Sequence, residues 1–177
     1  MRRRRRLRLV DLPRLIVGGA VQFAGLFGGR YRRSEGTHVL VTDERGRLLV
    51  VRTTYLGPEW MLPGGRIERG ETPHLAAERE ALEETGIRVS VERLVLIDAH
   101  HSHDVSFVFR GRVEGGELQP QFGEIAEVGW VDRAEIERTS PRLHRLLELI
   151  GEVGEGVVYL GLDSTSHADT KGLATHE

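Results

Sequence analysis

The segment from Gly64 to Ile87 constrains the fold of this chain more than any other part of it. It contains a helix with clear ends: Thr72 suits the N-cap, Pro73 fits the first helical position, and Gly86 ends the helix. Any fold must therefore place a helix of residues 73–85 against the rest of the domain.

The same helix carries a dense group of acidic residues. At about 100° per residue, Glu80, Glu83 and Glu84 fall within about a third of a turn of one another, and Leu75 and Leu82 lie on the opposite side. Like charges at helical spacing repel, and they repel more when partly buried. A hard cation such as Mg²⁺ would compensate, because it prefers oxygen ligands. An exposed, glutamate-rich helix remains the alternative.

The residues next to these glutamates differ in size and in the face of the helix on which they lie. Ala76 and Ala77 lie beside the glutamates and are small, so another element or a ligand can approach that face. Glu78 points elsewhere and is expected to be solvated surface.

The residues around the helix complete a longer pattern. Gly65 is followed after five residues by Glu71 and, after seven more, by the run Arg79-Glu80-Ala81-Leu82-Glu83-Glu84-Thr85-Gly86-Ile87. This resembles the Nudix box, G-x5-E-x7-R-E-U-x-E-E-x-G-U with U aliphatic, and every fixed letter matches. The preceding EWMLPGG is similar to the usual lead-in. The resemblance covers about residues 37 to 150.

The resemblance implies a fold and an activity. Nudix enzymes are α/β (α+β) proteins with an α/β/α sandwich around a mixed β-sheet. They use water and a divalent metal, Mg²⁺ (or Mn²⁺), to hydrolyse a phosphoanhydride bond in a nucleoside diphosphate linked to another moiety. Metal ions neutralise such a diphosphate and lower the pKa of bound water.

The resemblance also implies roles for particular residues. Four residues are expected to contact metal: Glu80 and Glu84 as principal ligands, Glu83 as a further ligand or as the base, and Gly65 through its carbonyl. Glu71 and Arg79 are expected to pair, so that the arginine holds the loop and offsets negative charge.

Further candidates lie outside the box. The segment FGEIAEVGWV offers Glu124 for the loop near the metal and Glu127 for a structural or substrate role, with solvated loop acids as the alternative. Arg52, at the end of its strand, faces either the pyrophosphate or solvent. Trp60 and Tyr55 lie near the box entrance, where an aromatic ring can stack on a base, although Trp60 can equally pack on the sheet.

The segment DAHHSHDVSF carries His100, His101 and His103 beside two aspartates. Strand alternation separates the first two, and histidine does not suit Mg²⁺. Surface, substrate contact and a second metal site all remain open there. Residues 101–106 contain neither the Pro nor the Tyr that marks some Nudix subfamilies. ADP-ribose-like sugars, nucleoside triphosphates including oxidised dNTPs, and nucleotide-sugar or alcohol diphosphates therefore stay open as substrates.

The rest of the pattern mixes strands and helices, as an α/β or α+β domain requires. THVLVTDERGRLLVVRT indicates two strands around a turn at 43–46, residues 87–101 and 104–116 indicate two more, and EVGWV indicates a short one. Asp132 and Glu135 form a candidate capping box for a short helix, and Ser140-Pro141 begins an amphipathic one.

Basic and acidic residues are distributed unevenly along the chain. Residues 1–33 hold ten Arg and one acid, whereas the remaining residues hold 15 basic and 26 acidic side chains. We expect an Arg-rich, apolar arm or helix at 1–33, a Nudix domain at 34–162 and a disordered tail at 163–177. The arm packs on its own domain or a partner subunit, or anchors at a membrane surface. A cleaved or spanning segment and a nucleic-acid-binding arm are further alternatives.

These features favour a cytoplasmic enzyme, peripheral at the inner membrane face if the arm binds lipid. The chain has no Cys, which excludes disulfides and thiolate metal sites. The expected partner is a small molecule containing a nucleoside diphosphate; a homodimer is open, and the acidic body does not favour specific nucleic-acid binding. Two other functions remain: a non-catalytic nucleotide sensor, and a membrane-associated diphosphatase for a lipid-linked substrate.

Overall fold

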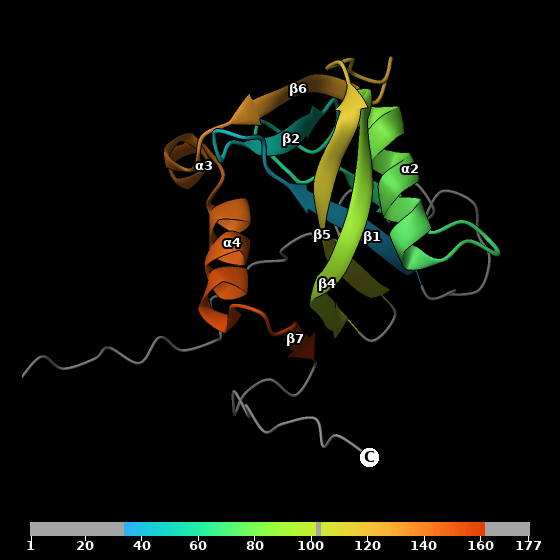
Figure 1. The fold of residues 1–177 in the computed structure, drawn as a ribbon, viewed down its shortest axis with the longest axis vertical. Helices are drawn as coiled ribbons and strands as arrows, with labels where there is room; N and C mark the ends of the chain where they lie inside the picture. Colours follow the sequence, from blue (N-terminus) through green and yellow to red (C-terminus); the bar gives the residue numbers. More distant parts are fainter. Residues whose placement is uncertain (1–33, 102–103, 162–177) are drawn as a thin grey trace, which may run out of the picture.

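The computed structural model describes residues 34–101 and 104–161, which form two sheets and the helices around them (Figure 1). In chain order the elements are β1 (Ser34–Val41), β2 (Leu48–Thr53), β3 (Gly64–Arg66), α2 (Pro73–Thr85), β4 (Ile87–His101), β5 (Asp104–Gly116), β6 (Ile125–Val131), α3 (Arg133–Thr139), α4 (Pro141–Val153) and β7 (Val158–Gly161).

The larger sheet is mixed. Its five strands have the order β3-β1-β5-β4-β7. Strands β1 and β5 run parallel, as do β4 and β7, whereas β1–β3 and β4–β5 are antiparallel. Strands β2 and β6 form a separate antiparallel pair. The two strands expected around the 43–46 turn are therefore confirmed, but each pairs mainly with strands far away in the sequence.

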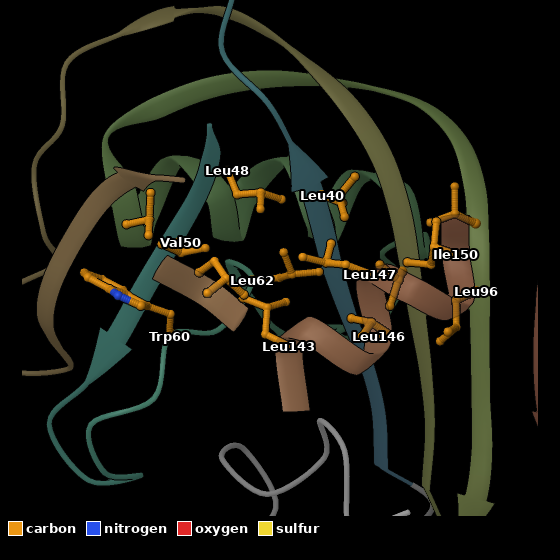
Figure 2. Packing of buried hydrophobic residues seen from close by; sticks show 14 of the residues in the cluster. Leu40, Leu48, Val50, Trp60, Leu62, Leu96, Leu143, Leu146, Leu147 and Ile150 are labelled. Carbon is orange, nitrogen blue, oxygen red and sulfur yellow. The ribbon is translucent and has the colours of Figure 1, made fainter. Parts of the chain in front are cut away.

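Helices cover both faces of the large sheet, so the α/β/α sandwich is confirmed. Figure 1 shows α2 on one side and α4 on the other. Along β1 the side chains alternate, with Val39 and Val41 in the cluster beside α2 and Leu40 in the cluster beside α4. Figure 2 shows this second cluster, in which Leu143, Leu146 and other apolar side chains of α4 pack with Leu40 and Leu96.

Helix α2 begins and ends where the sequence predicts. Pro73 is its first residue, and Gly86 adopts the left-handed conformation (φ 75°) and donates its N–H to Leu82 O over 2.9 Å. The helix packs through alanines; Ala76, Ala77 and Ala81 are fully buried, which lets it lie close to the sheet. Leu75 and Leu82, on the opposite side, are about half exposed (50% and 45%).

Two local expectations are wrong. Glu78 is not plain solvated surface, because its Oε1 accepts the Val91 N–H of β4 over 2.8 Å. The capping box at α3 does not form: Asp132 is the N-cap but makes no side-chain cap hydrogen bond. Glu135 instead accepts from the indole N–H of Trp60 (3.3 Å), and this tertiary partner competes with the local one.

Several expectations lie outside the described residues. These are the arm at 1–33, the tail at 163–177 and the side chains of His100, His101 and His103. Within the described ranges, no helix is long and apolar enough to cross a membrane.

Candidate active site

Arg79 organises the acidic face of α2. Its Nε and Nη2 donate to the two carboxylate oxygens of Glu71, each over 3.0 Å, and Nη2 also donates to the carbonyl of Arg66. Its Nη1 donates to Glu80 (2.9 Å) and Glu83 (3.0 Å). The guanidinium holds the pKa of Glu71 below its usual range. One cation thus ties the loop after β3 to the helix, and the expected pairing of Arg79 with Glu71 is present.

Glu84 is the most buried carboxylate of the group. It is 5% exposed, and its Oε2 accepts the N–H of Gly64 over 2.8 Å. Burial raises its pKa to about 8; the Gly64 N–H opposes this rise, and the charges of Glu80, Glu124 and Glu83 add to it. The pKa of Glu80 is also raised, again chiefly by burial, against the effect of Arg79. Negative charge at this site is therefore only partly compensated within the described chain.

Gly65 leaves room for the Glu80 carboxylate. A β-carbon built on Gly65 would lie 2.6 Å from Oε1 of Glu80 and 2.7 Å from Oε2. Real β-carbons do not approach other atoms so closely, so any larger residue at this position would force the Glu80 carboxylate to move. The backbone at Gly65 therefore lies close to the Glu80 carboxylate of the helix.

The two acids before and within β6 have different surroundings. Glu124 contributes to the raised pKa values of both Glu80 and Glu84, so its charge lies near theirs. Glu127 lies opposite Arg52 across the β2–β6 pair and accepts from its Nη1 over 2.6 Å. The structure therefore brings Glu124, and not Glu127, to the carboxylates of α2.

Arg52 and Trp60 pack directly on each other. The Arg52 guanidinium stacks over the indole ring at 3.8 Å from the ring centroid. Trp60 is 4% exposed, and its backbone N–H donates to the buried Ser140 Oγ over 2.7 Å. Of the two roles open for Trp60, packing is the one the structure shows.

Tyr55 joins the site, although no local pattern marks it. Its hydroxyl donates to Glu124 Oε1 over 3.2 Å. Burial raises its pKa to about 12, and the charges of Glu124, Glu84 and Glu80 contribute to the rise. The only sequence signal was an aromatic residue near the entrance of the box.

A family model described as the NUDIX domain matches residues 32–150. The chain belongs to the Nudix family. The Nudix box is thus the segment that carries Arg79 and the clustered carboxylates.

Named Nudix relatives agree with this membership. A MutT-like protein of Streptomyces ambofaciens is 36% identical over 121 residues, which cover 67% of this chain and 77% of the relative. A putative 8-oxo-dGTP diphosphatase of Bacillus subtilis is 33% identical over 99 residues, covering 55% of this chain and 66% of that protein. The chain is a hydrolase that acts on pyrophosphate bonds.

Solved structures support the Nudix fold. The crystal structure of an ADP-ribose pyrophosphatase from Streptococcus suis superposes with a TM-score of 0.57 at 22% identity, covering 72% of this chain and 98% of that one. At this level of identity the likeness concerns the fold alone.

The Nudix carboxylates suit a divalent cation by their chemistry. Glu80 and Glu84 each use one oxygen in the contacts above, and their second oxygens make no hydrogen bond to the described residues. Hard oxygen donors with excess negative charge are what Mg²⁺ and Mn²⁺ bind. Among the described residues, however, no three acidic or histidine side chains already converge as a metal cage, because Arg79 draws Glu80 and Glu83 toward itself.

Proposed function

We propose that this protein is a metal-dependent Nudix hydrolase that cleaves a phosphoanhydride bond in a nucleoside diphosphate linked to another moiety, with Mg²⁺ or Mn²⁺ as cofactor. The observation that carries the proposal is the burial of the Glu80 and Glu84 carboxylates on one face of α2, where, among the described residues, Arg79 contacts Glu80 and only the Gly64 N–H contacts the Glu84 carboxylate. Burial and the charge of Glu124 raise the pKa of both carboxylates, so their negative charge is only partly compensated in the described chain. A divalent cation and a polyphosphate would complete such a site.

Each residue of the group has a role in this proposal. Bound metal would neutralise the diphosphate and lower the pKa of the attacking water. Glu80 and Glu84 hold it through their second oxygens, with Glu83 as a further ligand or as the base and the Gly65 carbonyl as an additional contact. Arg79, fixed by Glu71, keeps Glu80 and the loop in place.

The residues outside the box have supporting roles. Arg52 binds Glu127 and covers the Trp60 ring, so we assign this trio to the stability of the β2–β6 pair beside the site. Glu124 stays next to the metal-binding carboxylates and can accept a proton from water. Catalysis of phosphoryl chemistry rests mainly on such positioning and charge stabilisation.

The choice of substrates to test first follows from the relatives. Because the Bacillus subtilis relative is named a putative 8-oxo-dGTP diphosphatase, we place nucleoside triphosphates, oxidised ones included, ahead of ADP-ribose and nucleotide sugars. We further propose that the catalytic domain spans residues 34–162, a range that contains most of the family match at residues 32–150.

The test is substrate hydrolysis by the full chain with Mg²⁺ or Mn²⁺, followed by chromatography of the nucleotide products, because cleavage of a pyrophosphate bond in ADP-ribose or a nucleotide sugar yields two phosphomonoesters and no free phosphate. The panel comprises dNTPs, 8-oxo-dGTP, ADP-ribose, nucleotide sugars and dinucleoside polyphosphates, with Glu84→Gln as the matched control, since it keeps an acceptor for the Gly64 N–H. Turnover of one class by the wild type, lost by orders of magnitude in the variant, supports the proposal. A folded wild-type protein that binds nucleotide but turns over no member of the panel would contradict it and favour a sensor.

A further inference from the structure

Tyr55 connects two loops that border the carboxylate group. It lies between β2 and β3, is 44% exposed, and donates its hydroxyl to Glu124 Oε1 over 3.2 Å. Neither the box nor its lead-in contains this residue. Its phenol hydroxyl therefore lies beside the carboxylate group of Glu80, Glu84 and Glu124, where it needs a structural explanation.

The backbone around Tyr55 is already fixed to the loop before β6. Thr54 donates its N–H to Glu124 O over 2.9 Å and its hydroxyl to Gly123 O over 3.2 Å. The register of β2 and β6 shifts next to this point, between Arg52 and Thr53. Such irregularities re-aim side chains at the ends of strands. Backbone hydrogen bonds thus hold the two loops together, and the hydrogen bond from Tyr55 additionally orients the Glu124 side chain.

The same loop is anchored on its other side to α2. Gln121 donates its N–H to Glu84 O over 3.3 Å and accepts the N–H of Ile125 over 3.1 Å. Glu124 therefore lies between the end of the box helix and the loop that carries Tyr55. The nearby charges of Glu80 and Glu84 repel its carboxylate, so without a donor it would turn toward solvent.

A neutral donor suits this position better than a cation. An arginine or lysine here would cancel the negative charge that binds metal, as Arg79 already does for part of the group. A phenol O–H orients the carboxylate and leaves its charge unchanged. The high pKa of Tyr55 agrees, because it keeps the hydroxyl protonated as a donor throughout the neutral range.

We propose that Tyr55 is a positioning residue of the hydrolytic site, whose hydroxyl holds the Glu124 carboxylate toward Glu80 and Glu84 so that Glu124 acts on the metal–polyphosphate complex. This rests on the proposed function. Substrate does not need to contact Tyr55, so the hydroxyl should affect kcat and metal affinity rather than KM for the nucleotide.

The experiment compares Tyr55→Phe, Glu124→Gln and the double variant, with Tyr159→Phe as the matched control on the edge strand β7. We expect Tyr55→Phe to lower kcat about tenfold, because it removes a hydrogen bond to a charged group. KM should change by less than about twofold. The melting temperature should stay unchanged, because the position is half-exposed. Since Tyr55 is proposed to act only through the charge of the Glu124 carboxylate, which Glu124→Gln already removes, the double variant should lose little more than Glu124→Gln alone. Tyr159→Phe should behave as the wild type.

Mn²⁺ affinity, followed by electron paramagnetic resonance without substrate, separates this inference from the proposed function. Weaker Mn²⁺ binding by Tyr55→Phe supports the positioning role even if the substrate panel finds no turnover. Wild-type kcat and Mn²⁺ affinity in Tyr55→Phe, a loss confined to KM, or additive losses in the double variant would overturn it. In that case an active wild type would leave the hydrolase assignment intact.

Discussion

Arg79 and Glu71 form a bidentate ion pair, in which Nε and Nη2 of the guanidinium each lie 3.0 Å from a different carboxylate oxygen. Because Glu71 lies in the loop after β3 and Arg79 lies at the middle of α2, the pair fastens this loop onto the helix. The same guanidinium also donates to Glu80, so the positions of the loop and of this proposed metal ligand both depend on one side chain.

Arg79→Lys should therefore cost both activity and stability. Lysine keeps the charge but cannot donate to both oxygens of Glu71 and to Glu80 at once. We expect kcat to fall by at least about tenfold and the free energy of unfolding by about 1–3 kcal/mol. Steady-state kinetics and urea unfolding measure the two effects. Arg145→Lys, at the exposed pair with Glu148, is the control and should change neither; an equal effect in both variants would contradict the special role of Arg79.

Gly65→Ala should move Glu80 without unfolding the protein. The added methyl group would lie 2.6 Å from the carboxylate, so the side chain must swing away from the metal position. We expect kcat to fall about tenfold or more while the circular dichroism spectrum stays native. Gly151→Ala in α4 meets nothing within 4 Å and should stabilise the fold by about 0.4–1 kcal/mol with normal kinetics. Full activity in Gly65→Ala would show that the contact is unimportant.

Glu84 should make the metal-depleted protein less stable as pH rises. Its folded pKa, about 8, lies above the ordinary carboxyl value of 4.5, so the folded state retains a proton that the unfolded state releases between these pH values. Stability from this group is present below pH 4.5 and is lost as pH rises through about 8. In EDTA, Glu84→Gln should therefore gain stability over the wild type with increasing pH, as urea unfolding at pH 5, 6.5 and 8.5 would reveal. Parallel pH profiles of the two proteins would be inconsistent with a buried, repelled carboxylate.

His38 should make the protein less stable as pH falls, whereas Glu84 makes it less stable as pH rises. Burial lowers its pKa from 6.5 to about 4, against a hydrogen bond with the Leu62 backbone and the charge of Asp98. Its contribution is complete above pH 6.5 and is lost as pH falls through about 4, by on the order of 3 kcal/mol. His38→Gln should flatten the stability profile between these values, whereas His144→Gln, on the partly exposed face of α4, should keep the wild-type slope. The same slope in His38→Gln as in the wild type would rule out this source of acid sensitivity.

The sequence predicted the long elements and the box well, for physical reasons. Pro73 and Gly86 are strong local signals for the ends of α2, and residues 87–101 and 104–116 have the composition of long strands. By contrast, β3 reads Gly-Gly-Arg and β7 has four residues, so neither carries enough local pattern to be recognised; they form because β1 and β4 offer unpaired edges.

The site was predictable only where one helix supplies it. Glu80, Glu83 and Glu84 share a face of α2, so spacing alone brings them together. Whether Glu124 or Glu127 joins them depends on the pairing of β6 with β2, which places Glu127 beside Arg52. Strand pairing between distant segments cannot be read from local sequence. For the same reason, the sequence offered Tyr55 only as an aromatic residue near the box entrance and not as a hydrogen-bond partner of Glu124.

The proposed hydrolysis requires Glu80 and Glu84 to hold a divalent metal. This requirement is tested most directly by titrating the full chain with Mn²⁺ by isothermal calorimetry, beside Glu80→Gln and Glu84→Gln and with Glu148→Gln on α4 as the control. We predict saturable binding by the wild type and the control, and at least about tenfold weaker binding by each of the two α2 variants. Equal Mn²⁺ affinity in all four proteins would contradict the proposal.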